Sequence, residues 1–309
     1  MKKITILIPC YNEEEVLPKL FERLEILTKS QSAFDWQLLF VNDGSNDRTR
    51  EMIVEEAEKP NVAYINLSRN YGKETAMAAG IANVNADAMI IIDADLQDPP
   101  ELIPDMIKLW QQGYDDVYAK RKSRQGETFF KKLTSSLYYK VLQKSTNIHI
   151  QADTGDFRLL DRKCILALQS IEETNRNTKA LFSWIGYKKA EILYDRAPRA
   201  LGNTKWNYAR LFALAVDGIL SFTIAPLRFA IFAGFFIAIF AFGYAASVLI
   251  KTLIFGIDWP GYASLMIVVL FLGGVQLVSI GILGEYIGRI FTETKKRPLY
   301  FIESKNLKQ

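Results

Sequence analysis

The chain has 309 residues, half of them hydrophobic, with a formal net charge of +4 and a single histidine. One histidine excludes His-rich zinc sites and a Ser-His-Asp triad. A net charge this small, without a clustered basic patch, gives no reason to expect nucleic acid as a partner. Cys10 and Cys164 lack metal-ligand or disulfide spacing and favour a reducing compartment. The first apolar run stops at Pro9, which is too short for a signal peptide, so we expect the N-terminal half in the cytosol.

Residues 1–205 alternate short apolar runs with amphipathic stretches. Glu14–Thr28 carries apolar residues at helical spacing, and similar stretches separate the runs that follow. The strands expected from the apolar runs are Ile4–Pro9, Trp36–Asn42, Val62–Leu67 and Met89–Ile92, with later ones at Gly155–Leu159 and Ala190–Tyr194. This alternation predicts an α/β domain with right-handed crossovers and a mostly parallel sheet.

Polar residues follow each of the first four expected strands. They are Tyr11 and Glu13, Asp43, Asn70, and finally Asp93 and Asp95. The carboxyl ends of parallel strands meet at one edge of a sheet, where open α/β sheets bind their ligands. We therefore expect the pocket at this edge.

The segment Met89–Glu101 is the most informative of these loops. Its apolar strand ends in Asp93-Ala94-Asp95-Leu96-Gln97-Asp98, and Pro99-Pro100 then starts a helix. Two carboxylates at this position suit Mg²⁺ or Mn²⁺, which would in turn hold a diphosphate. The alternative is an acidic turn that only caps the next helix. An EF-hand calcium loop is disfavoured because its glycine and terminal glutamate are missing.

Other nucleotide-binding motifs are incomplete. Gly72-Lys73 is similar to the end of a P-loop, but Leu67 occupies the place of its first glycine, and no G-x-G-x-x-G occurs. This disfavours a mononucleotide kinase and a dinucleotide-dependent dehydrogenase.

Three features of the middle of the chain leave alternatives open. The basic helix expected within Thr128–Leu142 either packs on the sheet or lies on a membrane surface. The loop Arg196–Trp206 is either a solvated loop or a cationic lid over phosphates. Asp156 is either an acid aimed into the pocket or a partner for Arg158.

The C-terminal part has the composition of a membrane hairpin. Leu227–Ile250 and Tyr262–Leu283 are long enough to span a bilayer, and Trp206–Phe222 carries an apolar stripe suited to the interface. Basic residues flank the hairpin, whereas its short loop carries one lysine, so we expect both ends in the cytosol. Gly284 and Gly288 have small-xxx-small spacing, which serves helix pairing within the chain or in a homo-oligomer.

These observations divide the chain into four parts. The expected parts are a cytosolic catalytic domain at 1–205, a juxtamembrane interfacial helix at 206–226, two transmembrane helices at 227–288 (about 227–250 and 262–284) and a cytosolic tail at 289–309. The expected location is thus the cell membrane, with two spans and the catalytic domain on the cytosolic side.

A set of motifs in fixed order resembles one family across nearly the whole chain. The motifs are Pro9-x-Tyr11-Asn12-Glu13, Asn42-Asp43-Gly44-Ser45-x-Asp47, Asn70-x-Gly72-Lys73, Asp93-Ala94-Asp95-Leu96-Gln97-Asp98-Pro99, Gly155-Asp156-Phe157-Arg158-Leu159 and Gly202-x-Thr204-Lys205-Trp206. They resemble the polyprenyl-phosphate glycosyltransferases of glycosyltransferase family 2, which have a GT-A (Rossmann-like) fold. The bactoprenol glucosyltransferase type is the nearest match, and dolichyl-phosphate mannosyltransferase is a more distant one.

The resemblance implies roles for particular residues. Those implied for the nucleotide sugar are Pro9, Tyr11, Glu13, Val41, Asp43, Asp93, Ala94, Asp95, Gln97, Arg199 and Lys205. Asp95 and Gln97 would be the main ligands of a Mg²⁺ or Mn²⁺ ion, together with Asp93. Arg121, Arg199 and Lys205 would neutralise phosphate charge, and Arg121 and Arg124 would receive the lipid phosphate. Asp156 would lie near the acceptor, and Asp95, Asp156, Arg121 and Lys205 form the implied catalytic set.

The implied reaction is inverting transfer of a hexose, glucose from UDP-glucose, to undecaprenyl phosphate at the cytosolic membrane face. Its product would be a lipid-linked sugar for cell-envelope glycosylation. The alternatives are N-acetylglucosamine, galactose, or mannose from GDP-mannose, and a non-catalytic membrane subunit. A processive polysaccharide synthase is disfavoured because the chain lacks a Gln-x-x-Arg-Trp motif and further membrane helices.

Overall fold

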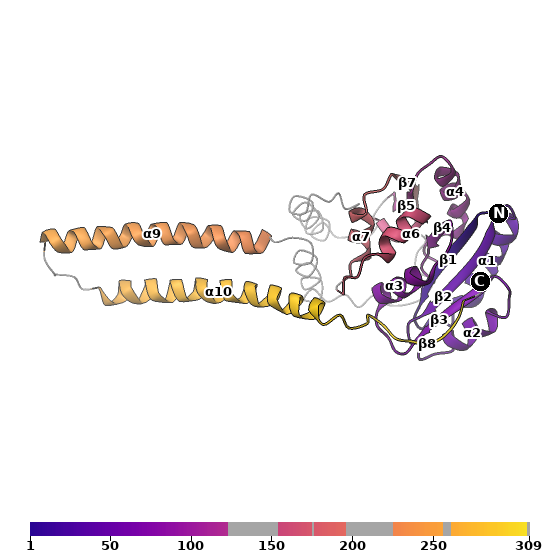
Figure 1. The fold of residues 1–309 in the computed structure, drawn as a ribbon, viewed down its shortest axis with the longest axis horizontal. Coiled ribbons are helices and arrows are strands. Elements are labelled where there is room, and N and C mark those ends of the chain that lie inside the picture. Colours follow the sequence, from indigo (N-terminus) through magenta and orange to yellow (C-terminus); the bar gives the residue numbers. More distant parts are fainter. Residues whose placement is uncertain (123–153, 175, 196–224, 256–260, 308–309) are drawn as a thin grey trace. The chain divides into compact units, whose positions relative to one another are not determined.

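The computed structural model describes residues 1–122, 154–174, 176–195, 225–255 and 261–307. The chain divides into two compact units, one holding a sheet with its helices and one holding two long helices (Figure 1). The helix expected within Thr128–Leu142, the loop Arg196–Trp206 and the stripe at Trp206–Phe222 lie outside the described residues.

The first unit is built on a mixed sheet, with eight strands in the described part of the chain, in the order β7-β5-β6-β4-β1-β2-β3-β8. The strands are β1 (Lys3–Cys10), β2 (Asp35–Asn42), β3 (Val62–Leu67), β4 (Ala88–Ile91), β5 (Asp116–Arg121), β6 (Thr154–Asp161), β7 (Lys189–Tyr194) and β8 (Ile302–Asn306). Neighbours among β1 to β4 run parallel, as do β5 and β7, whereas β6 is antiparallel to β4 and β5. The predicted α/β class with a mostly parallel sheet is confirmed.

Helices cover both faces of this sheet, which explains why its central strands are continuous apolar runs. One face packs against α1 (Leu17–Ser30), α2 (Thr49–Glu56) and α4 (Ile103–Gln111). In α1 the buried side chains recur at helical spacing: Leu17, Leu20, Leu24 and Leu27. The other face packs against α3 (Lys73–Asn83), α6 (Arg162–Gln169) and α7 (Thr178–Trp184). Asp156 and Arg158 of β6 lie on this second face.

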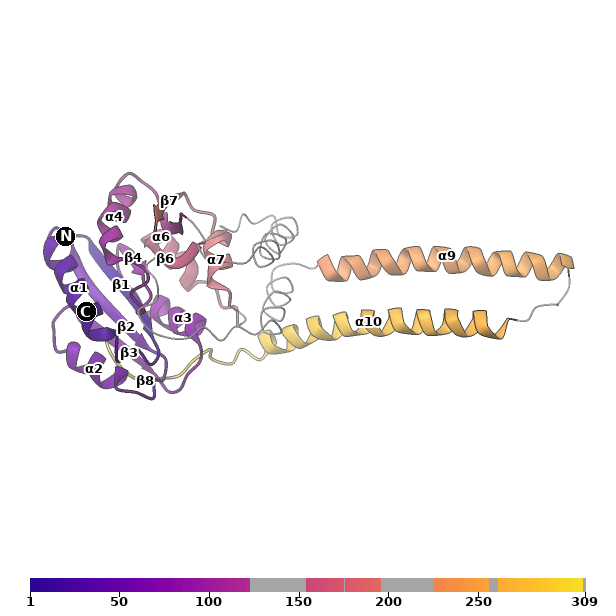
Figure 2. The same cartoon turned by 180° about the vertical axis from the view of Figure 1, so that it is seen from behind.

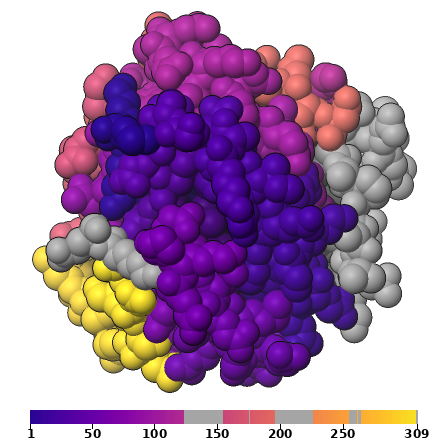
Figure 3. All heavy atoms as spheres, turned by 90° about the vertical axis from the view of Figure 1, so that its right-hand side faces the viewer, coloured from indigo at the N-terminus to yellow at the C-terminus, as the bar shows by residue number. Residues whose placement is uncertain are grey.

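Two strands were not expected from the sequence. β5 inserts beside β6, and β8 pairs antiparallel with β3, so part of the segment 289–309, predicted only as a tail, extends the sheet. Glu303 of β8 forms a two-contact ion pair with Arg50 of α2, and Ser304 accepts a hydrogen bond from Asn66 of β3. In Figure 3 the yellow C-terminal residues accordingly lie beside purple residues of this unit. The chain before and after the two long helices thus contributes to one sheet.

The second unit is a pair of neighbouring helices, α9 (Ala225–Phe255) and α10 (Tyr262–Thr294) (Figure 2). Their apolar segments, Pro226–Ile254 and Ser264–Thr294, have mean hydropathies of 2.2 and 2.5 and expose their side chains. The 29 residues of the first segment extend about 44 Å, more than the roughly 30 Å of a bilayer core. Both helices are long and apolar enough to cross a membrane, which suggests a membrane-associated protein.

Candidate active site

Strands of different direction bring their polar ends to one edge of the sheet. Ile91 at the end of β4 lies opposite Arg158 of the antiparallel β6, so Asp93 follows β4 where Asp156 begins β6. Arg121 at the end of β5 lies opposite Tyr194 at the end of β7. The loops after β1, β2 and β3 leave the same edge, because these strands are parallel to β4. The structure therefore brings to one edge those predicted pocket residues that lie among the described residues.

The loops after β1 and β2 hold each other through hydrogen bonds from backbone amides to side-chain oxygens. Asn12, at a positive φ of 55°, accepts a bond from the Asn46 amide at 2.9 Å and donates its own amide to the Ser45 hydroxyl at 3.0 Å. The Glu13 amide donates to the Thr49 hydroxyl at 2.8 Å. A non-glycine residue held in the left-handed region is typical of functional loops.

The residues predicted for the nucleotide base and ribose differ in their exposure. Tyr11 is exposed and Glu13 is half-buried, so both side chains can meet a ligand. Pro9 and Val41 are buried in β1 and β2, and their side chains lie beneath the surface of the site. Asp43 follows β2 and is also buried.

Asp43 fixes the loop that leads into α3. Its two carboxylate oxygens accept hydrogen bonds from the amides of Tyr71 and Gly72, both at 2.8 Å. Burial raises the pKa of Asp43, and these two hydrogen bonds oppose the rise only in part. The adjacent Gly44 has a φ of 63°, and a Cβ there would lie 2.3 Å from the backbone carbon of Arg69. The two loops therefore touch along their backbones.

Lys73, the first residue of α3, bridges two carboxylates of the site. Its Nζ lies 2.5 Å from Asp93 Oδ1 and 2.6 Å from Asp156 Oδ2. Asp156 is only 6% exposed, and its Oδ1 is buried with no hydrogen-bond partner in the described part of the chain. Burial alone raises the pKa of Asp156, but the nearby charges of Lys73 and Lys179 lower it below its usual value. The partner of Asp156 is therefore Lys73, which resolves the alternative that the sequence left open.

The acidic loop after β4 is not a helix cap. Asp95 Oδ1 accepts the amide of Gln97 at 3.1 Å, and Leu96 between them has a positive φ of 57°. The helical segments that follow, η1 (Pro100–Leu102) and α4, begin without a side-chain cap. The left-handed turn at Leu96 therefore sets the shape of this loop and does not start the helix. Such strained residues are typical of functional sites.

The oxygen donors of this loop fit a hard divalent cation. No group of three or more His, Cys, Asp or Glu side chains suited to a metal occurs in the described ranges. Mg²⁺ is usually held by one or two carboxylates together with substrate phosphates, rather than by a cage made only of protein. Because Lys73 already pairs with Asp93 Oδ1, Asp95 and Gln97 are the residues of this loop that could hold such an ion.

Arg121 lies beside Tyr194, which binds a buried acid, Asp98, that had no predicted role. The Tyr194 hydroxyl donates to Asp98 Oδ1, and burial raises the pKa of Tyr194 while the charge of Arg121 opposes the rise. Arg121 Nε is buried and lacks a hydrogen-bond partner among the described residues. The other predicted phosphate-binding cations, Arg124, Arg199 and Lys205, lie outside the described residues.

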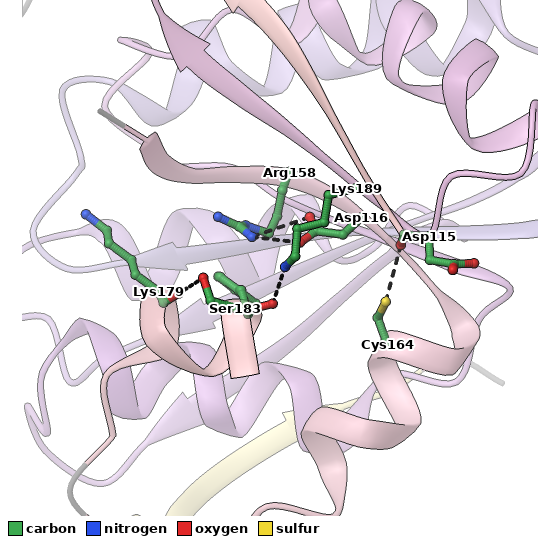
Figure 4. Close-up of polar contacts among 8 residues, drawn as sticks. Asp115, Asp116, Arg158, Cys164, Lys179, Ser183 and Lys189 are labelled. Atoms are coloured by element: carbon green, nitrogen blue, oxygen red, sulfur yellow. Dashed lines mark hydrogen bonds and ion pairs between the residues drawn. The ribbon is translucent and has the colours of Figure 1, made fainter. Parts of the chain in front are cut away.

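A second charged cluster lies deeper on the same face of β6 (Figure 4). Arg158 Nη1 lies 3.1 Å from Asp116 Oδ2, and Lys189 Nζ reaches the same oxygen at 3.0 Å. The Arg158 guanidinium also stacks 3.8 Å from the centroid of the Phe182 ring. The charged groups pair with one another and the Phe182 ring covers the guanidinium, so the cluster supports β6, although Arg158 Nε has no hydrogen-bond partner among the described residues.

The cysteines take no part in the site. The Cys164 thiol lies 3.3 Å from the Asp115 carbonyl oxygen, and burial raises its pKa to about 12 (Figure 4). Burial also raises the pKa of Cys10 well above its usual value. Both side chains therefore stay protonated at neutral pH, and protonated thiols are poor nucleophiles.

Sequence reasoning missed three residues of this edge: Lys73, Asp98 and Tyr194. Lys73 and Asp98 stand in the recognised motifs, which was the available signal, but their partners come from strands far along the chain. Tyr194 ends an expected strand and carried no signal of its own.

A mixed sheet with an Asp-x-Asp loop at the carboxyl end of a central strand is the architecture of a GT-A glycosyltransferase. Residues 5–167 match the family model described as glycosyl transferase family 2, and residues 225–290 match the GtrB C-terminal hairpin. The chain therefore belongs to glycosyltransferase family 2, as its motifs predicted.

Similar proteins extend over the full length. An uncharacterized glycosyltransferase of Synechocystis is 48% identical over 97% of this chain and 94% of its own length. The bactoprenol glucosyl transferase of Shigella phage SfV is 41% identical, covering 99% of this chain and all of the relative. A mycobacterial protein of known crystal structure, 15% identical, has a TM-score of 0.50 over 72% of this chain and 75% of its own, which supports the fold alone.

Proposed function

We propose that this chain transfers glucose from UDP-glucose to undecaprenyl phosphate, with inversion, at the cytosolic face of the cell membrane. The lipid-linked sugar would serve cell-envelope glycosylation. Full-length similarity to relatives named bactoprenol glucosyl transferase supports the sugar and the polyprenyl-phosphate acceptor. The observation that carries the proposal is the Lys73 bridge, which sets the donor-side Asp93 beside the acceptor-side Asp156.

The donor would bind along the loops after β1, β2 and β4. Tyr11 and Glu13 offer exposed groups to the nucleotide, while Asp43 keeps the neighbouring loop in place. Asp95 and Gln97 would hold a divalent cation, Mg²⁺ or Mn²⁺. When bound, such an ion supplies positive charge against the departing nucleoside diphosphate.

The proposed reaction does not need a strong general base. A lipid phosphate is anionic at neutral pH and can attack the anomeric carbon directly, whereas the departing diphosphate must be stabilised. Arg121 is the described cation suited to phosphate, and Arg124, Arg199 and Lys205 are proposed to assist it. Attack from the face opposite the leaving group would invert the anomeric configuration.

The membrane anchor is proposed to place the site where a lipid acceptor can reach it. β8 follows α10 in the chain and pairs with β3, which precedes α9. Since both ends of the hairpin contribute to one sheet, two crossings return the chain to the side from which it left. The flanking basic residues favour the cytosol for that side.

The test uses the full-length protein in liposomes that contain undecaprenyl phosphate. Radiolabelled UDP-glucose, UDP-N-acetylglucosamine, UDP-galactose and GDP-mannose are supplied in parallel, with and without EDTA. We expect label in the organic phase from UDP-glucose, its loss with EDTA, and its recovery when Mg²⁺ or Mn²⁺ is added in excess.

The other possible results would each change one part of the proposed function. Label from a different donor would replace glucose by that sugar. Unchanged labelling in EDTA would contradict the metal role. Neither transfer nor donor hydrolysis with any of the four donors would support a non-catalytic membrane subunit instead.

A further inference from the structure

We infer that Lys73 is a positioning residue: it ties Asp156 to the donor-side Asp93 and leaves Asp156 Oδ1 as the oxygen that meets the acceptor phosphate. This inference rests on the proposed function. It assigns a role to a side chain that is neither a predicted ligand of the nucleotide sugar nor a predicted metal ligand.

The position of Lys73 is set from the nucleotide side of the site. Asp43 accepts the amides of Tyr71 and Gly72, and Gly72, with a φ of 93°, turns the chain into α3. Only glycine adopts this backbone conformation readily. Lys73 follows at once as the first helical residue, so the anchored loop determines where its ammonium group lies.

The ammonium group determines the place of Asp156 in turn. Asp93 and Asp156 both carry carboxylates within 2.6 Å of the same Nζ. Without a cation between them, two neighbouring carboxylates would repel each other and one would separate or take up a proton. Lys73 therefore fixes the distance between the donor side and the acceptor side.

The second oxygen of Asp156 remains available. Oδ1 is buried and has no hydrogen-bond partner in the described part of the chain. A buried polar atom without a partner is costly unless a ligand or water satisfies it. A phosphate monoester can present a hydroxyl group that donates to this oxygen, which would orient the remaining phosphate oxygens toward the sugar.

The bridge also differs from a purely structural ion pair. The Lys73 side chain is 42% exposed, whereas Asp116 and Arg158 of the deeper cluster are almost completely buried. An exposed cation at the edge of a site contributes less to folding than a buried one. The place of Lys73 between two acids is better explained by the distance that it sets between them.

The experiment is a double-mutant cycle on the full-length protein in liposomes with undecaprenyl phosphate. The variants are K73M, D156N and the combination, and each is assayed for kcat, for the donor and acceptor KM, and for its melting temperature. We expect K73M to lower kcat about 100-fold while the donor KM changes less than about threefold. Because both side chains act as one unit, the combined variant should have a kcat within about threefold of D156N.

Two further variants make the readout specific. K108M removes an exposed lysine on α4 that pairs with Asp105 of the same helix in the described part of the chain, and it should keep the wild-type kcat. K73R retains a cation between the two acids and should exceed K73M in kcat by at least about tenfold, although its planar group fits less well. If K73M fails to accumulate as folded protein, a K73R kcat at least about tenfold above that of D156N supports the role of Lys73, and a K73R kcat no higher than that of D156N overturns it.

The outcomes separate the inference from the function on which it rests. Multiplicative losses of kcat in the combined variant, a K73R variant no better than K73M, or wild-type kcat in K73M would each overturn the role of Lys73. In all of these cases the wild-type protein still forms a glycosylated lipid. If the wild-type protein forms none from any of the four donors, the proposed function fails and the inference fails with it.

Discussion

Two charged clusters on the same face of β6 differ in one respect that separates structure from function. Around Arg158, two cations meet Asp116, the Asp116 and Arg158 side chains are at most 1% exposed, and an aromatic ring covers the guanidinium. Around Asp156, two carboxylates meet one half-exposed cation, and one carboxylate oxygen has no partner in the described part of the chain.

The difference follows from what each cluster has to do. A closed network of buried charges gains nothing from a ligand, and it rigidifies the strand that carries it. The network around Asp156 is instead open to solvent through the half-exposed Lys73 side chain, so a ligand can reach it. Among the described residues both clusters hold one buried atom without a hydrogen-bond partner, Asp156 Oδ1 and Arg158 Nε, but only the first lies in a cluster with an exposed member. Asp156 and Arg158 belong to one motif and stand two residues apart, yet they serve these separate roles.

The largest effect is expected from breaking the closed network. Asp116→Asn leaves Arg158 buried without a countercharge, which should destabilise the protein by about 3–5 kcal/mol. For a domain of this size that corresponds to a fall in melting temperature of about 10 °C, measured by thermal unfolding of the full-length protein in detergent. Asp105→Asn, an exposed acid on α4, is the matched control and should melt like the wild type. A D116N variant with the same melting temperature as D105N would contradict the structural role of Asp116.

A smaller effect is expected from the open network, and it depends on pH. Burial raises the pKa of Asp156, but the charges of Lys73 and Lys179 bring it below the usual value near 4. A carboxylate with a lowered pKa in the folded state stabilises the protein above its usual pKa, and this contribution is lost as the pH falls through the lower value. The difference in melting temperature between wild type and Asp156→Asn should therefore be constant near pH 6 and shrink below about pH 4. A difference that grows on acidification would contradict the assignment.

Much of the fold could be predicted because its strands are apolar and its helices periodic. β3 was predicted with its exact bounds, and β1, β2, β4 and β7 to within a residue or two. β5 was missed because it begins with Asp116 and ends with Lys120 and Arg121, so it does not look like a buried strand. Asp116 can be buried there because it pairs with Arg158, which lies far along the chain. β8, with the sequence IESKN, is a polar edge strand that is specified by β3 rather than by its own pattern.

The sequence predicted which strand ends carry the site residues, but it did not predict which of these residues contact one another. The Asp-x-Asp loop and Asp156 could be recognised as separate motifs, since each is a short run of characteristic residues. That Lys73 joins them depends on the antiparallel register of β4 and β6, whose strands are more than 60 residues apart in the chain. The partner of Asp98, Tyr194, depends on the same kind of long-range pairing.

Asp95 is the main proposed ligand of the divalent cation, so the proposed transfer depends on it most directly. The decisive measurement compares Asp95→Ala with Asp105→Ala in liposomes that contain undecaprenyl phosphate, radiolabelled UDP-glucose and Mn²⁺, counting the label in the organic phase. We expect D105A to label the lipid like the wild type, and D95A to lose at least about 100-fold in rate, because it cannot hold the ion that stabilises the departing diphosphate. Equal labelling by the two variants would contradict the account.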